Sequence, residues 1–242
     1  MNSLSVIVPA YNEEDNLDIT VAHLIDTFNK RNIDWELILI NDGSTDRTEE
    51  IIERLVARQP NIKLIHHKQN MGIGSCFRHG IENASKEIIT WIPADGENDI
   101  NELIKYLPLL EHVDIVIPFV LNVGMRSWGR RILSTVYLWI INLSFGTMFN
   151  YTNGNVVYRR RIFEIFKPES TGFFFQTECL IRAVRAGFIF AEVPVRLKGR
   201  RGGHSKALTI KSLCTVVWEF IMLFLAVHIF RTAGRVPKHV QL

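Results

Sequence analysis

Three carboxylates follow a short apolar run near the middle of the chain. The run, residues 87–92, ends at Pro93, and Asp95, Glu97 and Asp99 come directly after it. The pattern is that of a buried strand that stops at the proline. Residues two apart on an extended chain point the same way, so Asp95 and Glu97 could share one hard cation. A solvated acidic turn is the alternative that this stretch leaves open.

The elements before this stretch repeat a strand-loop-helix order. Apolar runs at 4–8, 35–40 and 62–66 predict strands, and each precedes a polar loop and a segment with helical spacing of apolar residues. Together with 87–92, they predict a parallel, doubly wound α/β sheet. The ligand crevice of such a sheet lies at the carboxyl ends of its strands, and the candidate loops all lie at that edge. Further on, 103–110 is predicted to be a helix.

Length and charge bound the class of protein. The chain has 242 residues, of which 47% are hydrophobic, which suits one large or two small domains with a buried core. Residues 1–100 hold 9 Lys or Arg and 17 Asp or Glu, whereas residues 101–242 hold 19 and 8. This split indicates a cation bound by the first half and an anionic partner, phosphate or membrane surface, bound by the second. The three cysteines show no disulfide or zinc spacing, so we expect a reducing compartment, and no signal peptide is expected.

The polar loops of the first half form an ordered series of motifs. They span residues 9–14, 41–46, 70–72 and 94–97, with the sequences PAYNEE, NDGSTD, NMG and ADGE. In this order and spacing they resemble the motifs of family 2 glycosyltransferases. The resemblance implies the GT-A fold, a mostly parallel Rossmann-like sheet with flanking helices, and a nucleotide-sugar donor.

The resemblance also assigns roles to single residues. It places nucleotide binding at the following residues of the first three motifs: Pro9, Tyr11, Glu13, Asp42 and Gly72. It places the metal, Mg²⁺ or Mn²⁺, at Asp95, which is also expected to be catalytic; Glu97 is the second metal ligand that we expect, from its spacing to Asp95 and not from the resemblance. For Glu13, the alternative is that its negative charge only stabilises the N-terminus of the following helix, through the helix dipole.

Two residues depart from the family pattern at the metal site. Family members usually carry an Asp two residues before the metal-binding Asp, where this chain has Pro93, which offers neither a ligand nor an N–H. The relatives carry Gln where this chain has Glu97. We therefore expect Glu97 to supply the missing carboxylate. The alternative is that Asp95 alone binds the metal.

The second half contains two long apolar runs. Residues 132–149 carry no charge, and residues 213–230 contain only Glu219 and His228 as ionisable groups apart from Cys214. Both runs are near the lower length limit for a bilayer span. We expect amphipathic helices that lie in the membrane interface, with basic residues on anionic headgroups. Core or oligomer-interface helices are an alternative for both, and a C-terminal span is a further alternative for 213–230.

Three later motifs narrow the resemblance. The sequences YTNG at 151–154, FFFQTE at 173–178 and RRGGHSK at 200–206 resemble polyprenyl-phosphate sugar synthases of the dolichol-phosphate mannose synthase type. The resemblance implies an acceptor-phosphate site at Arg130, Ser134 and Ser205, and catalytic contacts to phosphate from Arg200 and Lys206. Arginine offers a planar fork to phosphate oxygens, and lysine offers a point charge.

The expected organisation is a catalytic domain over residues 1–206, which includes an interfacial helix at 132–149, and a membrane-associated helical tail over 207–242. The expected function is metal-dependent, inverting transfer of a hexose from UDP- or GDP-hexose to a polyprenyl phosphate at the cytoplasmic face of the membrane. A lipid phosphate is already an oxyanion, so positioning and a cation on the leaving diphosphate suffice. A surface-polysaccharide acceptor and a non-catalytic nucleotide-sugar-binding subunit are the alternatives. A homo-oligomer is left open, and no nucleic-acid partner is expected.

Overall fold

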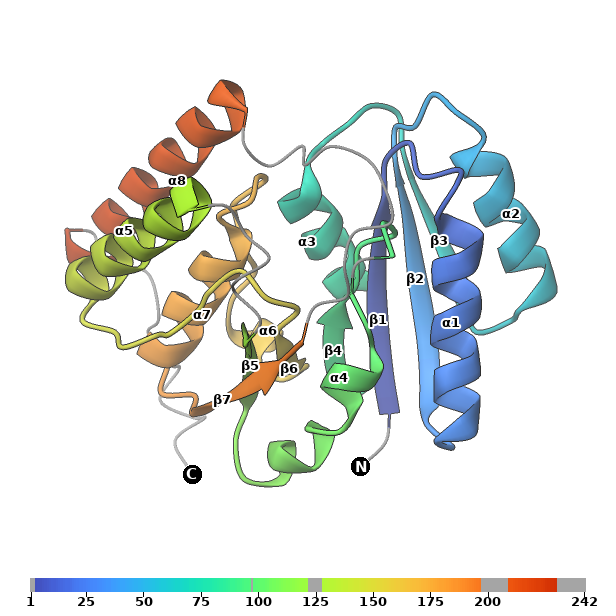
Figure 1. Cartoon of the computed structure of the whole chain (residues 1–242), viewed down its shortest axis with the longest axis horizontal. Coiled ribbons are helices and arrows are strands. Elements are labelled where there is room, and N and C mark those ends of the chain that lie inside the picture. The colour runs from blue at the N-terminus through green and yellow to red at the C-terminus, as the bar shows by residue number, and fades with distance from the viewer. Residues whose placement is uncertain (1–2, 97, 122–127, 197–208, 230–242) are drawn as a thin grey trace.

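The computed structural model describes residues 3–96, 98–121, 128–196 and 209–229. Within these residues a seven-stranded sheet has the order β3-β2-β1-β4-β6-β5-β7 (Figure 1). The strands are β1 Ser3–Ala10, β2 Asp34–Asp42, β3 Ile62–His67, β4 Ile88–Trp91, β5 Ile115–Val120, β6 Val157–Arg159 and β7 Phe190–Val195. Only β6 runs antiparallel to its neighbours, β4 and β5. The predicted parallel, doubly wound sheet is therefore confirmed, with one antiparallel strand added.

Helices connect the strands and cover both faces of the sheet. They are α1 Leu17–Lys30, α2 Thr48–Arg58, α3 Ile73–Asn83, α4 Asn101–Ile104, α5 Trp128–Phe145, α6 Ile162–Ile165, α7 Phe175–Arg185 and α8 Ile210–His228. The single helix predicted over 103–110 is wrong, because α4 ends at Ile104 and a 3₁₀-helix, Leu107–Glu111, follows. Pro108 at the start of this 3₁₀-helix has no N–H to continue the α-helical ladder.

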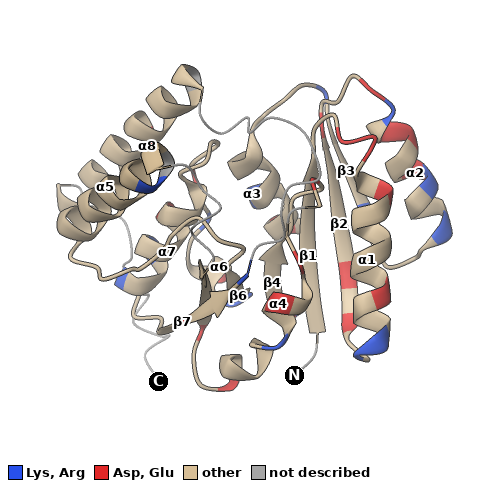
Figure 2. Ribbon diagram, viewed as in Figure 1, with Lys and Arg blue, Asp and Glu red and all other residues tan. Residues whose placement is uncertain are grey.

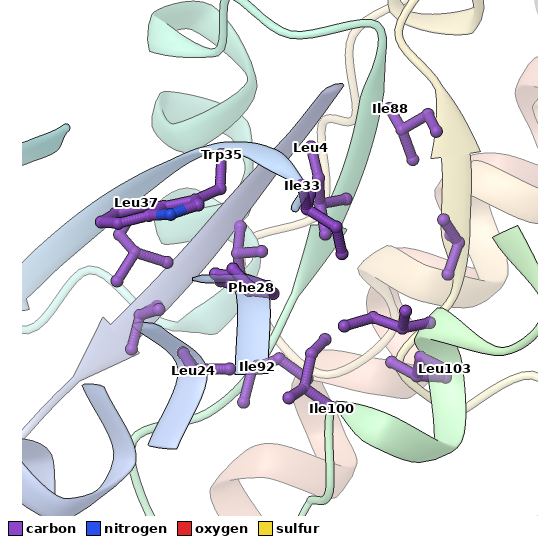
Figure 3. Packing of buried hydrophobic residues seen from close by; sticks show 14 of the residues in the cluster. Leu4, Leu24, Phe28, Ile33, Trp35, Leu37, Ile88, Ile92, Ile100 and Leu103 are labelled. Atoms are coloured by element: carbon purple, nitrogen blue, oxygen red, sulfur yellow. The ribbon is translucent and has the colours of Figure 1, made fainter. Parts of the chain in front are cut away.

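The strands bury both of their faces, which explains their continuous apolar runs. Leu4, Val6 and Val8 of β1 pack with Phe28 of α1 in one core cluster, part of which is drawn in Figure 3. Ile7 points to the other face and packs in a second cluster, beneath α3 and α7. Two cores of this kind fix the sheet from both sides, so the loops at its carboxyl edge start from rigid positions.

Helices α5 and α8 lie side by side at one end of the molecule (Figure 1). The ring of Phe145 on α5 contacts the rings of Phe220 and Phe224 on α8, with centroids 5.8 and 6.2 Å apart. The ring of Phe174, next to α7, contacts Phe220 and ties the pair to the second core. Among the described residues, no helix combines the length and the hydropathy needed to cross a bilayer.

Candidate functional site

The chain after β4 places Asp95 at the carboxyl edge of the sheet. Beyond the end of β4, the N–H groups of Ile92 and Ala94 still donate to carbonyls of β1, at 2.9 and 3.3 Å. The hydroxyl of Thr20 on α1 donates to the carbonyl of Ala94 at 3.1 Å. These bonds hold the segment along β1 up to the residue before Asp95. Asp95 therefore follows directly on backbone that is fixed beside the end of β1, at the sheet edge that the sequence predicted.

Side chains join the loop after β1 to the loop after β2. The N–H of Asn12 donates to the hydroxyl of Ser44 at 3.0 Å, and the N–H of Glu13 donates to the hydroxyl of Thr48 at 2.9 Å. In return, the side-chain oxygen of Asn12 accepts the N–H of Thr45 at 2.8 Å. The two motifs that the resemblance assigns to the nucleotide thus form one bonded unit.

Two carboxylates complete this unit. Asp46 accepts the N–H of Thr48, the first residue of α2, at 3.0 Å, and the N–H of Glu14 at 3.2 Å. Burial by itself raises the pKa of Asp46, but the hydrogen bonds from Thr48 and Glu14 outweigh it and hold the pKa below its usual value. Glu14 pairs with Arg47 at 3.0 Å, whereas the carboxylate of Glu13 accepts the nearby amide of Asn16 at 3.1 Å. Glu14 therefore has a structural role, and the nucleotide contact predicted for Glu13 stays a prediction.

Asp42 is buried at the end of β2 and holds the loop before α3. One carboxylate oxygen accepts His67 Nδ1–H and the N–H of Met71, both at 2.8 Å, and the other accepts the N–H of Gly72 at 3.1 Å. Gly72 has a positive φ of 88°, and a Cβ there would lie 2.5 Å from the carbonyl oxygen of Thr171. The contact of Asp42 with a base or ribose stays a prediction, because these oxygens already accept bonds from the protein.

A small polar network surrounds Asp42. The ligand-type atoms of Asp42, His67 and Cys76 lie within 4.8 Å of one another. His67 Nε2 faces His79 Nδ1 at 2.8 Å, and burial, followed by the neighbouring carboxylate of Asp42, raises the pKa of the Cys76 thiol. The buried His67 is thus bonded on both ring nitrogens, to Asp42 and to His79.

A pocket of about 190 Å³ opens beside Asp95, between the ends of β4, β5 and β7. Its polar lining includes Asn98, Tyr151, Asn153 and Arg196. None of these four was predicted as a site residue. The YTNG motif was the signal for two of them, Tyr151 and Asn153, but it did not show that they line the same pocket as Asp95.

Asp99, the third acid of the opening stretch, has a structural role. His23 Nε2 lies 3.1 Å from its carboxylate, which also accepts the N–H of Asn101 at the start of α4 at 3.1 Å. It also lines the pocket, so its charge faces the same space as that of Asp95. Asp99 is therefore fixed by contacts with α1 and α4, whereas Asp95 lies at the mouth of the pocket.

The structure brings together one part of the predicted site and leaves the other part untested. Pro9, Tyr11, Asp42, Gly72 and Asp95 all lie at the same edge of the sheet. Ser134 lies half-buried on α5. Arg130 lies on α5, but its side chain is not described. The remaining predicted residues lie outside the described residues: Glu97, Arg200, Ser205 and Lys206.

Comparisons with known proteins agree with this geometry. The sequence model of the family described as "Glycosyl transferase family 2" matches residues 5–169. The chain is 28% identical over 225 residues to the dolichyl-phosphate beta-glucosyltransferase ALG5A of Trichomonas vaginalis (strain ATCC PRA-98 / G3), which covers 84% of this chain and 68% of that protein. It is 34% identical over 117 residues to ALG5D of the same organism, covering 42% of this chain but only 36% of that protein.

Among solved structures, the chain resembles glucosyl-3-phosphoglycerate synthase from Mycobacterium tuberculosis in complex with Mn²⁺, UDP-glucose and phosphoglyceric acid. The TM-score is 0.69 at 20% identity, over 92% of this chain and 80% of that one. The complex of the same synthase with Mg²⁺ and UDP gives a TM-score of 0.64 at 21% identity, over 92% and 79% of the two chains. At this identity the likeness shows the fold alone, and it confirms the predicted GT-A architecture.

Proposed function

Because the chain belongs to glycosyl transferase family 2, we propose that it transfers glucose from UDP-glucose to a polyprenyl phosphate, with the help of a divalent cation. The observation that carries the proposal is the position of Asp95: it lines the pocket, and the backbone before it is held by β1 and α1 at the sheet edge that also carries the joined loops after β1 and β2. The relative that covers most of the chain is named a dolichyl-phosphate beta-glucosyltransferase, which supports glucose and a polyprenyl phosphate. The solved relative with UDP-glucose supports the choice of donor.

The residues at the pocket fit a hard cation. Asp95 and Asn98 offer a carboxylate and an amide oxygen from one wall, and oxygen ligands of this kind suit Mg²⁺ and Mn²⁺. Glu97 is the neighbour that we propose as the second carboxylate, in place of the family acid that Pro93 replaces. When bound, the cation would supply charge neutralisation to the departing diphosphate.

The proposed reaction needs no proton transfer within the site. An oxygen of the lipid phosphate forms a bond to the anomeric carbon of glucose as the bond from that carbon to the diphosphate oxygen breaks, so the configuration inverts. The monoester is already an anion at neutral pH, and its attack requires in-line placement rather than a general base. Arg130, Ser134 and Ser205 are the residues that we propose to hold the acceptor phosphate. Arg200 and Lys206 are those that we propose to stabilise the charge of the diphosphate.

We propose that the paired helices α5 and α8 place this site at an anionic lipid surface. Their outward side chains are large and apolar, and Trp139 and Trp218 are 75% and 63% exposed. The two ribbons carry almost no charge in Figure 2, whereas Arg131 at the start of α5 is exposed beside Trp128. An apolar face bordered by a cation suits the boundary between acyl chains and anionic headgroups. The buried free thiols of Cys76 and Cys179 support the cytoplasmic face.

Radiolabelled UDP-glucose, polyprenyl phosphate and Mn²⁺ or Mg²⁺ in detergent or vesicles test the proposal. We expect a chloroform-soluble product that requires the metal. Asp95→Asn should reduce its formation by about a hundredfold, which corresponds to a loss of about 2.7 kcal/mol of charge stabilisation. Glu87→Gln, which changes an exposed acid before the other end of β4, is the matched control and should keep wild-type turnover.

The same assay separates the alternatives. Labelled product on a water-soluble saccharide, with none on lipid, would replace the proposed acceptor by a surface polysaccharide. UDP binding without turnover on any acceptor would point to the non-catalytic subunit, for which the loss of the family acid at Pro93 is the motive. Activity that persists after chelation of all divalent metal would overturn the metal part alone.

A further inference from the structure

Two glutamates hold the segment 169–172. This segment packs against residues 70–74, which contain the predicted nucleotide-binding residue Gly72 and which we call the donor loop. Four consecutive backbone N–H groups of this segment donate to these two side chains. Those of Glu169 and Ser170 donate to Glu178 of α7 at 3.1 and 2.8 Å. Those of Thr171 and Gly172 donate to one oxygen of Glu219 of α8 at 2.7 and 3.0 Å. The segment is thus anchored on one side to a buried core helix and on the other to the helix with the apolar outer face.

The segment contacts the donor loop through backbone atoms. The N–H of Gly74 donates to the carbonyl of Thr171 at 2.8 Å. A Cβ at Gly72 would lie 2.5 Å from this same carbonyl oxygen, and a Cβ at Gly74 would lie 2.8 Å from the carbonyl carbon. Such close contact leaves no room for the segment to shift without moving residues 72–74. On its other side, the donor loop is held by Asp42, whose carboxylate accepts the N–H groups of Met71 and Gly72. The loop is therefore fixed between Asp42 and the 171–172 backbone.

The two anchors differ in their surroundings. Glu178 is buried and forms an ion pair with Arg182 at 2.7 Å, as expected of a structural group. Glu219 forms no ion pair with another described residue, and its second oxygen, Oε2, is buried without a hydrogen-bond partner among them. A buried carboxylate oxygen without a partner is unfavourable, so Glu219 is less well satisfied by the described residues than Glu178.

We propose that Glu219 is a positioning residue of the donor site: from α8 it fixes the 171–172 backbone, and through it residues 72–74, the turn into α3, which receive the nucleotide. This inference rests on the proposed donor site. Its consequence is that removal of the carboxylate loosens the turn and weakens donor binding while the sheet stays intact. Donor affinity therefore depends on a residue that does not itself touch the donor.

The test compares variants that differ in what they can accept from the 171–172 amides. Glu219→Ala removes both oxygens, Glu219→Asp is one methylene shorter, and Glu219→Gln keeps one accepting oxygen at nearly the same place. We expect UDP with Mn²⁺ to bind at least about fivefold more weakly to the Ala and Asp variants, and within about twofold of wild type to the Gln variant. With UDP-glucose as substrate, the Ala variant should raise KM while kcat changes little.

Asp114→Ala is the matched control. Asp114 also accepts a backbone N–H, that of Ile189 at 3.1 Å, but just before β5, at the opposite edge of the sheet. It should lower stability without changing UDP affinity. Amide hydrogen exchange gives a readout that needs no ligand: the N–H groups of residues 72–74 should exchange faster in Glu219→Ala and at the wild-type rate in Asp114→Ala.

Each outcome decides a separate point. Wild-type UDP affinity in Glu219→Ala, or unchanged exchange at residues 72–74, would overturn the positioning role and leave the proposed function standing. A wild-type chain that binds no UDP would overturn the proposed donor, and faster exchange in the Ala variant would still establish the coupling from Glu219 to the turn. A Gln variant as weak as the Ala variant would show that the charge of Glu219 matters and its accepted hydrogen bonds do not, and would overturn positioning through the 171–172 amides.

Discussion

The loops at the carboxyl edge and the α5–α8 pair are stabilised by different interactions. The loops are joined by hydrogen bonds between side chains and backbone, such as those of Asn12 with Ser44 and of Asp42 with Gly72. The helical pair is joined by contacts between aromatic rings, such as Phe145 with Phe220, and leaves its outer face uncovered. Directional bonds fix the position of each atom, whereas apolar packing fixes mainly the area that is buried. The loops should therefore tolerate few changes, and the outer face of the pair many.

Two glycines show the same difference between the loops and the helical pair. Gly43, in the loop after β2, has a positive φ of 71°, and a Cβ there would lie 2.6 Å from the Cα of Gln69. Gly129, on α5, has no heavy atom within 4 Å of a Cβ built on it. One position requires glycine for both conformation and space, and the other requires it for neither.

The largest expected effect on stability is that of Gly43→Ala. A left-handed conformation costs a non-glycine residue about 1–3 kcal/mol, and overlap with rigid backbone adds about 1–3 kcal/mol. We expect the free energy of unfolding to fall by about 4 kcal/mol, against no loss, or a gain of up to about 1 kcal/mol, for Gly129→Ala. Urea unfolding followed by circular dichroism measures both. Equal effects of the two variants would show that the loop is no more constrained than the helix.

The same contrast explains what could be predicted from the sequence. The apolar runs and the polar residues after each of them predicted the first four strands and the edge at which Asp95 lies, because these signals are local. Strand β6, of three residues, and the helix break at Pro108 were missed, because short segments carry too little pattern. The bonds of Asp42 with His67 and of Glu219 with Thr171 join residues 25 and 48 positions apart, so they depend on the tertiary arrangement.

A smaller effect on the free energy of unfolding is expected at acidic pH, from a glutamate at the amino end of β2. Glu36 of β2 accepts the hydroxyl of Ser5 at 2.6 Å and both the N–H and the hydroxyl of Ser85, and it pairs with Lys63 at 2.8 Å. Burial by itself raises the pKa of Glu36, but the bonds from Lys63, Ser5 and Ser85 outweigh it and lower the pKa to about 2. The folded pKa thus lies below the unfolded value of 4.5.

The sign of the pH dependence follows. A carboxyl with a lowered folded pKa stabilises the fold fully above pH 4.5, and this stabilisation is lost as the pH falls from 4.5 through about 2. The shift corresponds to about 3 kcal/mol. We expect Glu36→Gln to be less stable than wild type at pH 7, with a difference that shrinks toward pH 2.5 in urea titrations. Glu82→Gln, which changes an exposed partner of Lys167, should run parallel to wild type. A constant difference between Glu36→Gln and wild type would refute the lowered pKa.

The smallest effect on stability is expected on the outer face of the helical pair, where the effect on lipid binding should be large. Trp139 and Trp218 are mostly exposed, so Trp139→Ser and Trp218→Ser should change the free energy of unfolding by less than about 0.5 kcal/mol. If this face enters an anionic bilayer, each substitution removes apolar area from the contact, and each should weaken binding to vesicles about tenfold, which is about 1.4 kcal/mol. Flotation with phosphatidylglycerol-containing vesicles measures the binding, and Ile19→Ser, at a 60% exposed position on α1, is the matched control.

Wild-type flotation of both Trp variants would exclude the helical pair as the lipid contact. If the wild-type chain instead forms a dimer by light scattering that Trp139→Ser dissociates, and does not float, a second copy of the chain covers this face. Either result leaves unchanged the expectation that the face contributes little to folding, because that follows from the exposure of its side chains and not from what covers them.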